Sequence, residues 1–298
     1  MKPDVECGIC LMHWVHSRVA PHTEKNALPD MTRRLLDALL HGVVPEVNLG
    51  SLCNTAVWSV FEPSSPAAIH YEELKRDSNK NARTLLSLAK RYVESAKTDR
   101  EKLERACGLA AASNVAPLNS PTGAYTFQEI RQIIEGGEDQ PVVMGDIYAA
   151  VKDAQKILYV TDNAGEIGFD SLVIDIIKRM GPSVTLVVKG RTYFEDATCE
   201  DAQFFNLETI VDRLVTTEGF FAPQEVSEEL RRVFAESDLL LVKGTGSYEA
   251  FAGDTEGKPA IFMLKVKCDP IARETGIPKG RVVVRLDAGP NGRTGDGR

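Results

Sequence analysis

The spacing of hydrophobic residues divides the chain into two parts that meet near residue 148. In the first part, apolar side chains recur every three or four positions among charged residues, most clearly over residues 71–94 and 97–112. This spacing is typical of amphipathic helices that bury one face against a core. No alternation of apolar and polar residues typical of strands is evident there. We therefore expect residues 1–148 to form a helical N-terminal domain, built as a bundle.

A further short helix is expected over residues 126–135, close to the end of this part. Thr126 stands where an N-cap residue would bind a free backbone N–H group, and Glu129 follows three residues later. Gly136 and Gly137 come directly after the helix, and glycine is the residue that most often ends a helix.

From residue 156 onward, short continuous apolar runs alternate with helix-compatible segments and polar or glycine-rich turns. The runs are Ile157–Val160, Val184–Val188, Leu239–Val242, Ala260–Leu264 and Val282–Val284. Because both faces of such strands are apolar, the pattern predicts an α/β fold with a parallel sheet covered by helices on both sides. Glu166–Met180 is apolar around much of its helical circumference, which fits a helix packed on that sheet. We expect this domain over residues 149–288 and a flexible polar tail over 289–298.

Composition and charge limit the possible partners. Asp and Glu outnumber Lys and Arg by 43 to 35, which gives a net charge of -8. A general affinity for nucleic acid or an anionic membrane needs the opposite sign, so neither partner is expected. No apolar run reaches the roughly 18 residues of a membrane span, and the polar N-terminus lacks a signal-peptide core, so we expect a cytoplasmic protein. The six cysteines are sparse, which favours reduced thiols over a disulfide framework.

Candidate chemistry lies at the ends of the expected strands, where open parallel sheets bind their ligands. Asp162 and Asn163 follow the first strand directly, and Gly165 permits a sharp turn into the next helix at Glu166. Two adjacent oxygen donors on a rigid strand end suit a hard divalent cation. The structural alternative is a strand-to-helix turn in which Asp162 or Asn163 caps the helix, a role that both residue types commonly fill.

Two further strand ends are polar. Asp196 lies 34 residues after Asp162, about one strand and helix later, so neighbouring strands would bring the two carboxylates to one metal ion. The alternative makes Asp196 or Thr198 an ordinary helix cap. The third end, residues 243–249, carries a lysine and two glycines that would let backbone N–H groups approach a phosphate. Position 249 is Glu where a dinucleotide-binding motif needs a third glycine, so that motif is excluded.

Taken together, four strings resemble the damage-control phosphatase family, formerly known as domain of unknown function 89. They are Asp162–Ile167, Asp196–Ala202, Lys243–Glu249 and Lys267–Ala272. Cys7-x-x-Cys10 resembles the stand-alone prokaryotic branch of that family, and the N-terminal helices fall in the expected order. The agreement extends over most of the chain.

The resemblance implies a helical N-terminal region joined to a Rossmann-like domain, and a phosphatase that depends on a divalent metal ion: Mg²⁺, Mn²⁺, Co²⁺ or Ni²⁺. Its substrates would be small phosphorylated metabolites, such as sugar phosphates or damaged cofactor precursors. Metal ligands of the family map onto Asp162, Asn163 and Asp196, and we expect the two aspartates to be catalytic as well. The residues expected to bind substrate or phosphate are Lys243, Gly244, Gly246, Asn114 and Glu166.

Two positions depart from the family pattern and bear on the selectivity of the pocket. Glu195 precedes Asp196 where asparagine is usual, and Ser247 stands where the glycine-rich turn often has asparagine. The physiological substrate, the attacking group (water or a carboxylate) and the oligomeric state stay open from sequence.

Other functions compete with this interpretation. An S-adenosylmethionine-dependent methyltransferase also uses a Rossmann-like sheet, but it needs a glycine-rich loop where residues 162–165 offer one glycine. A non-catalytic protein that binds a phosphorylated metabolite is the other alternative. Cys7, Cys10, His13 and His16 invite a zinc interpretation, but four ligands at that spacing on one helix cannot converge on one ion. Half a site with a distant partner, a redox pair and plain core residues stay open for Cys7 and Cys10.

Overall fold

The computed structural model describes residues 1, 3–42, 47–222 and 225–289. Its α-helices are α1 (Cys7–Val19), α2 (Leu28–Gly42), α3 (Leu49–Val60), α4 (Pro66–Glu94), α5 (Asp99–Ala112), α6 (Gln128–Ile134), α7 (Ile147–Asp153), α8 (Glu166–Met180), α9 (Cys199–Phe204), α10 (Glu228–Glu236), α11 (Thr245–Phe251) and α12 (Asp269–Thr275). Short 3-10 helices, η1 (Ala20–His22) and η2 (Leu207–Thr209), follow α1 and α9. The expected helices are confirmed: residues 71–94 lie within α4, α5 begins two residues later than the expected helix over 97–112, and α8 has the expected bounds 166–180.

The strands of the described residues form one seven-stranded sheet in the order β1-β7-β6-β5-β2-β3-β4. They are β1 (Val142–Met144), β2 (Lys156–Val160), β3 (Ser183–Lys189), β4 (Arg213–Thr217), β5 (Leu239–Lys243), β6 (Ala260–Lys265) and β7 (Val282–Asp287). Every neighbouring pair is parallel except β6 and β7. The predicted α/β class with a mostly parallel sheet is therefore confirmed.

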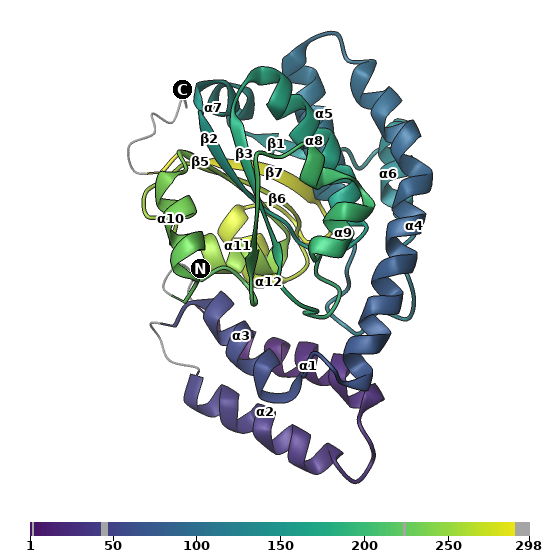
Figure 1. Ribbon diagram of the computed structural model, residues 1–298, viewed down its shortest axis with the longest axis vertical. Helices are drawn as coiled ribbons and strands as arrows, with labels where there is room; N and C mark the ends of the chain where they lie inside the picture. The colour runs from purple at the N-terminus through teal and green to yellow at the C-terminus, as the bar shows by residue number, and fades with distance from the viewer. Residues whose placement is uncertain (2, 43–46, 223–224, 290–298) are drawn as a thin grey trace.

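Helices cover both faces of the sheet, with α1, α2 and α3 forming a layer at one end of the molecule (Figure 1). The alternation of side chains along β2 separates two hydrophobic clusters: Ile157 and Tyr159 join one, Leu158 and Val160 the other. The first cluster includes residues of α4, α5 and α8, and the second includes residues of α1, α2 and α3. Each cluster thus joins helices of the N-terminal half to the strands of the C-terminal half.

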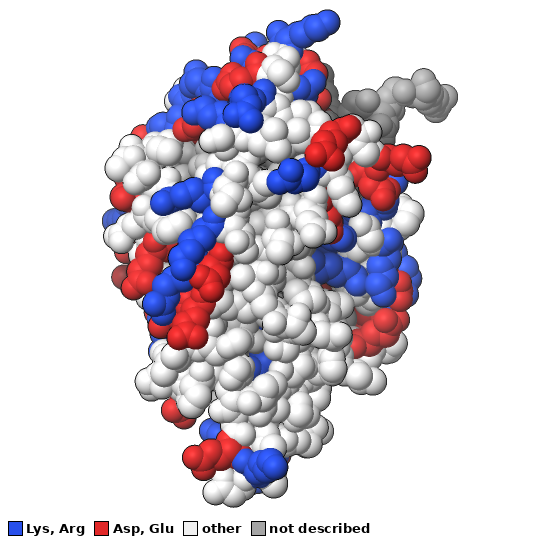
Figure 2. Space-filling model, turned by 90° about the vertical axis from the view of Figure 1, so that its right-hand side faces the viewer, with Lys and Arg blue, Asp and Glu red and all other residues white. Residues whose placement is uncertain are grey.

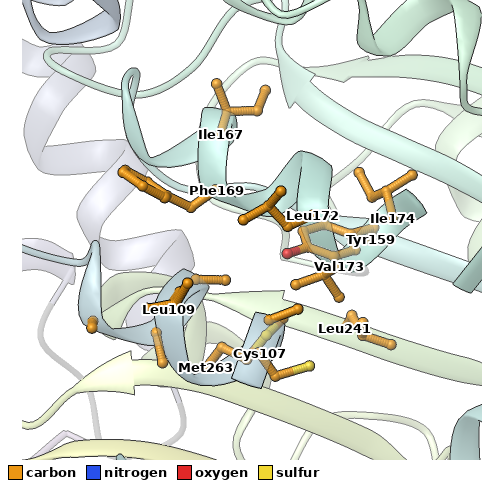
Figure 3. Packing of buried hydrophobic residues seen from close by; sticks show 14 of the residues in the cluster. Cys107, Leu109, Tyr159, Ile167, Phe169, Leu172, Val173, Ile174, Leu241 and Met263 are labelled. Atoms are coloured by element: carbon orange, nitrogen blue, oxygen red, sulfur yellow. The ribbon is translucent and has the colours of Figure 1, made fainter. Parts of the chain in front are cut away.

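The first cluster shows why the central helix has apolar residues on most of its surface. In Figure 3, Leu172 and Val173 of α8 lie close to Tyr159 of β2, and Cys107 and Leu109 of α5 lie on the other side of the same cluster. Because α8 contacts strand β3 as well as the helices α4 and α5, it buries side chains in more than one direction.

Several local expectations for the first half of the chain are wrong. Residues 142–144 form a strand, although no strand was expected before residue 148; β1 is short and is held at the sheet edge by parallel pairing with β7. Thr126 does not cap a helix, because α6 begins at Gln128 after Phe127, whose φ is 53°. In the second half of the chain, strand β4 was not predicted; it is a short strand at the opposite edge of the sheet. Residues 290–298 of the expected tail lie outside the described residues.

Charged side chains of both signs are interspersed on the face that Figure 2 shows, which is the right-hand side of Figure 1. On α4, Glu72 and Arg76 form one such pair and Asp77 and Lys80 another, at the helical spacing of four and three residues. No helix within the described part of the chain is long and apolar enough to cross a membrane.

Candidate active site

Asp162, Asn163 and Asp196 meet at one edge of the sheet because β2 and β3 are parallel neighbours. Asp162 and Asn163 follow β2, and Asp196 lies in the segment that follows β3. The two segments are joined by backbone hydrogen bonds: Ala197 N donates to Asp162 O at 2.8 Å, and Ala164 N donates to Glu195 O at 2.9 Å. Strand β2 lies between β3 and β5, so the carboxyl end of β2 is also the point where the strand order reverses.

None of these three residues caps the helix that follows it. The N-cap residue of α8 is Gly165, and no side chain makes a capping hydrogen bond there. The N–H of Gly165 donates to Asn79 Oδ1 of α4 at 2.6 Å. The N-cap of α9 is Thr198, whose N–H donates to Asp201 Oδ2 at 2.7 Å. The capping alternative is thus wrong for Asp162, Asn163 and Asp196 and correct for Thr198.

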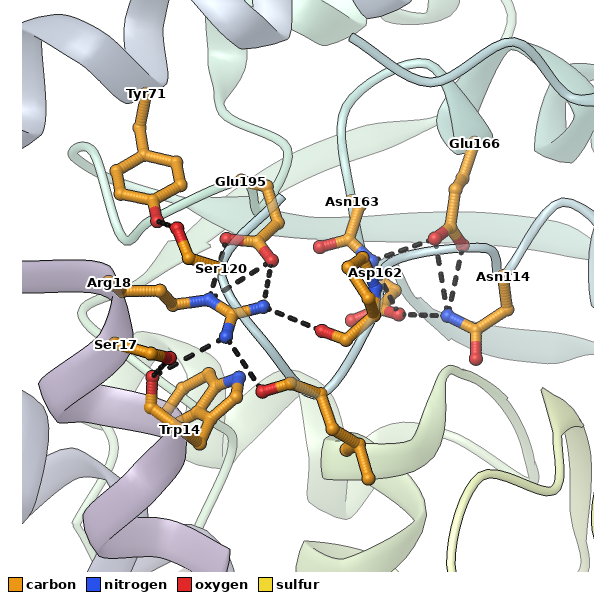
Figure 4. A network of polar contacts seen from close by, with 12 residues as sticks. Trp14, Ser17, Arg18, Tyr71, Asn114, Ser120, Asp162, Asn163, Glu166 and Glu195 are labelled. Carbon is orange, nitrogen blue, oxygen red and sulfur yellow. Dashed lines mark hydrogen bonds and ion pairs between the residues drawn. The ribbon is translucent and has the colours of Figure 1, made fainter. Parts of the chain in front are cut away.

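Two amides hold the Asp162 carboxylate (Figure 4). Asp162 Oδ2 accepts from Asn114 Nδ2 at 2.5 Å and from Asn163 Nδ2 at 2.9 Å. The same amide groups donate to Glu166, from Asn163 Nδ2 at 2.7 Å and from Asn114 Nδ2 at 3.2 Å. Asn114 comes directly after α5 and its capping residue Ser113, so a helix of the N-terminal half places one of the groups that orient Asp162.

Asp162 and Asp196 are buried, and burial has the largest effect on the pKa of each. Burial raises the pKa of Asp162 to about 7, with the neighbouring Glu166 adding to the effect. Burial also raises the pKa of Asp196 to about 7, against the opposing effect of Lys189. Lys189 Nζ lies 2.9 Å from Asp196 Oδ2, but outside hydrogen-bonding geometry, and that oxygen accepts no hydrogen bond. A cation at this edge would relieve both costs.

Lys243 lies behind the site. Its side chain is fully buried, and its Nζ lies 3.0 Å from Asp170 Oδ1 and 3.3 Å from Glu166 Oε2. Burial favours the neutral amine, but Asp170 and Glu166 outweigh it and raise the pKa of Lys243, so the side chain stays charged. Lys243 does not line the cavity described below. Its contact with a phosphate stays a prediction, and its contacts here neutralise Glu166.

The two predicted glycines allow the turn after β5 to lie against the site. Gly244 has a φ of 83°, and a Cβ atom at this position would collide with the Asp162 carboxylate. A Cβ atom on Gly246 would collide with the ring of Phe220. Glycine is required at both positions by close approach, and at Gly244 also by backbone conformation.

A cavity of about 530 Å³ opens over these residues. Asp162, Asn163 and Asp196 line it, and helix α1, residues 116–118, Phe220 and the segment after β6 form its walls. Most of the wall is apolar, with Leu11, Trp14 and Leu118 among its side chains.

Lys267 is a cavity residue to which the sequence reasoning assigned no role. It follows β6, is half-buried and lines the cavity. Its Nζ makes no hydrogen bond or ion pair with the described residues, and burial lowers its pKa, against the opposing effect of Asp162 and Glu166. The signal in the sequence was its place in the string Lys267–Ala272 at a strand end.

The cysteines of the CxxC pair also line the cavity, together with Cys53 and Cys268. All six cysteines of the chain are free thiols. No group of three or more His, Cys, Asp or Glu side chains in the described part of the chain is arranged to hold a metal ion. His13 is instead hydrogen-bonded to Asn119. The zinc interpretation gains no support.

The buried carboxyl groups predict how stability depends on pH. Asp162, Asp196 and Glu249 each have a pKa of about 7 in the folded protein, against about 4 when unfolded. Between these values the folded state binds more protons, so the free energy of unfolding of metal-free protein falls as pH rises from 5 to 8. We expect a loss of at least about 1.4 kcal/mol, the equivalent of one pKa unit of one group. Urea unfolding in a chelator at both pH values measures it.

Burial also lowers the pKa of His22, which acts in the opposite direction over the same range. Comparison with the Asp162→Asn variant isolates the carboxyl contribution, because the pH dependence should become smaller when this group is removed. A free energy of unfolding that is constant or rises from pH 5 to 8 would contradict the raised pKa values of these buried carboxyl groups.

The sequence of the chain is similar to one family model and to known proteins of two archaea. A family model described as the damage-control phosphatase ARMT1-like domain matches residues 5–283. The chain is 33% identical over 295 residues to a damage-control phosphatase of Archaeoglobus fulgidus, covering 96% of this chain and 99% of the relative. It is 27% identical over 294 residues to a damage-control phosphatase of Pyrococcus horikoshii, covering 95% and 97% of the two chains.

A solved structure supports the fold. The crystal structure of a DUF89 family protein from Pyrococcus horikoshii superposes with a TM-score of 0.77 at 24% identity, covering 95% of this chain and 98% of that one.

Proposed function

The chain belongs to the damage-control phosphatase family, and on this premise we propose that it hydrolyses small phosphorylated metabolites with the help of a divalent metal ion. The observation that carries the proposal is the convergence of Asp162, Asn163 and Asp196, from two adjacent strand ends, at the base of one cavity. Family membership disfavours the methyltransferase alternative.

The side-chain oxygens of Asp162, Asn163 and Asp196, called the donor set below, fit a hard divalent cation. Nδ2 of Asn163 and Nδ2 of Asn114 both donate to Asp162 Oδ2, and no hydrogen bond from a described residue to Asp162 Oδ1 or Asn163 Oδ1 is seen. Asp196 Oδ2 likewise accepts none, although Lys189 Nζ lies 2.9 Å from it. Two carboxylates and an amide oxygen are ligands suited to Mg²⁺ or Mn²⁺. A divalent ion bound by these three residues would neutralise charge on the phosphoryl oxygens and so lower the barrier to phosphoryl transfer.

The protein's own residues would bind and orient the rest of the substrate. Lys267 is a cationic residue that lines the cavity, and it would bind a phosphate oxygen as a hydrogen-bond donor. Gly244 and Gly246 leave room for the backbone of the turn beside it. The apolar wall from α1 would contact the leaving group and keep bulk water away from the reacting phosphate. A cavity of about 530 Å³ is of the size that holds a small metabolite.

Metal removal tests the proposal. Protein stripped of metal by a chelator should not hydrolyse para-nitrophenyl phosphate, and addition of Mg²⁺, Mn²⁺, Co²⁺ or Ni²⁺ in turn should restore hydrolysis with at least one ion, because the ion would supply the positive charge that stabilises the transferring phosphoryl group. Released phosphate and nitrophenol should appear in equal amounts.

Sugar phosphates serve as the second substrate set, since an artificial ester need not fit the cavity. A folded protein that binds metal but hydrolyses neither set would overturn the phosphatase proposal. Binding of a phosphorylated metabolite without turnover would favour the non-catalytic alternative.

A further inference from the structure

Arg18 of α1 is a buried arginine that hydrogen-bonds two separate segments of the candidate site. Its side chain is 1% exposed, and that of Glu195 is 4% exposed. Arg18 Nη2 donates to Glu195 Oε1 at 2.5 Å, and Nε lies 3.2 Å from each carboxylate oxygen. The same guanidinium donates to the carbonyl oxygens of Pro117 at 2.9 Å and Leu118 at 3.2 Å. Figure 4 shows these contacts beside the network that holds Asp162.

Of the two segments that Arg18 joins, one carries a residue that orients Asp162 and the other carries Asp196. Residues 114–118 begin with Asn114, whose amide orients Asp162. Residues 195–196 place Asp196 next to Glu195, whose backbone oxygen accepts the hydrogen bond from Ala164 N. One side chain from the N-terminal helix layer therefore links the segment that orients Asp162 to the segment that carries Asp196.

We propose that Arg18 and Glu195 form a positioning pair that sets the relative placement of Asp162 and Asp196. The inference rests on the proposed function in that the donor set is taken to bind a divalent ion. We assign the pair a positioning role and not a catalytic one. Arg18 does not line the cavity, and Glu195 lines it but accepts hydrogen bonds from the guanidinium at both carboxylate oxygens.

Stability alone gives little reason for such a pair. Desolvating two charges is costly, and well-packed apolar side chains of similar volume often serve as well or better. Here the guanidinium also donates to carbonyl groups of a second segment, and apolar side chains would leave those carbonyls without a donor. The planar fork of arginine supplies several donors in fixed directions, which lysine lacks.

The pair also connects the site to the wall of the cavity. Trp14, one turn before Arg18 on α1, lines the cavity. The Arg18 guanidinium carbon lies 5.1 Å from the centre of the Trp14 ring and 5.8 Å from that of Phe194. The helix that faces the leaving-group side of the cavity is thus the helix that holds the two segments of the donor set.

Direct measurement of Mn²⁺ binding by calorimetry tests the inference. Arg18→Met should raise the Mn²⁺ dissociation constant by about tenfold to 100-fold, the range seen when groups that orient metal ligands are removed. Arg18→Lys should recover only part of this loss, because it keeps the charge but not the fork. Glu195→Gln, which keeps the side-chain volume, should give a smaller loss, and the double variant should lose less than the product of the two single losses. The Mn²⁺ concentration for half-maximal hydrolysis should shift in parallel.

Leu35→Ala is the matched control for loss of stability. Leu35 lies in the same helix layer, is fully buried and does not line the cavity. This variant should lower the unfolding temperature and leave the Mn²⁺ dissociation constant at the wild-type value. Should Arg18→Met not fold, Arg18→Lys and Glu195→Gln carry the same comparison.

The outcomes separate this inference from the proposed function. Arg18 and Glu195 variants that bind Mn²⁺ as tightly as the wild type would overturn the positioning role, whatever their activity. A wild-type protein that binds Mn²⁺ without hydrolysing phosphate esters would overturn the phosphatase proposal, and the dissociation constants would still decide the role of Arg18. Wild-type protein that binds none of Mg²⁺, Mn²⁺, Co²⁺ and Ni²⁺ would overturn both, and if it binds another of these ions but not Mn²⁺, the same dissociation constants are compared with that ion.

Discussion

Replacing Asp162 with asparagine is expected to lower kcat at saturating Mn²⁺ by about 10³-fold or more. The substitution keeps the shape of the side chain and an oxygen that can accept from Asn114 and Asn163, but it removes the negative charge that the proposed metal ion requires. Steady-state hydrolysis of para-nitrophenyl phosphate by variant and wild type, each titrated with Mn²⁺, measures the effect.

The folded state of this variant should be at least as stable as that of the metal-free wild type at pH 8. Asp162 is a buried carboxylate whose pKa is raised to about 7 by burial and by Glu166, so ionising it costs free energy that asparagine does not incur. A thermal unfolding temperature that is unchanged or higher, together with lost activity, would exclude unfolding as the cause. Activity within tenfold of the wild type would contradict the assignment of Asp162.

Replacing Gly244 with alanine is expected to lower kcat/KM by about 100-fold. The φ of 83° at this position is unfavourable for alanine, and the new methyl group would collide with the Asp162 carboxylate. Asp162 or the turn after β5 must move, and a displacement of about 1 Å is enough for a loss of this size. The strain should also lower the free energy of unfolding by about 1–3 kcal/mol. Steady-state kinetics and urea unfolding measure the two effects.

Gly253→Ala is the matched control for Gly244→Ala. Its φ is 82°, nearly the same, but no atom lies within 4 Å of the Cβ position. This variant should show a comparable loss of stability from backbone conformation and keep the wild-type kcat/KM. Equal losses of activity in both variants would show that the backbone conformation, and not contact with Asp162, accounts for the effect.

The fold class and the convergence of Asp162, Asn163 and Asp196 on one cavity were accessible from sequence, whereas metal binding by these residues stays a prediction. Runs such as Leu239–Val242 are apolar at consecutive positions, which marks strands covered on both faces. Asp162 and Asn163 follow such a run directly, and neighbouring parallel strands place their ends at the same edge. The resemblance of the four strings to one family pointed in the same direction, and the family is confirmed.

Elements at the edges of the sheet were not accessible in the same way. Strand β1 has three residues, and β4 is bordered by charged and polar side chains, so neither has a long apolar run. Their pairing with β7 and β3 is what makes them strands. Thr126 has a residue type suited to helix capping, but the chain turns through Phe127 before α6 begins.

The sequence by itself determined which apolar runs form the buried strands, which segments form the main helices that cover them, and which polar side chains follow those strands. Each of these features follows from a pattern within a few residues. What only the tertiary structure decided is which charges face each other. Lys243 ends strand β5 and Lys267 follows strand β6, yet the first is buried against Asp170 and the second lines the cavity. Arg18 and Glu195 are 177 residues apart and meet as a buried pair. Electrostatic interactions depend on distance and burial in space, and neither quantity can be read from separation along the chain.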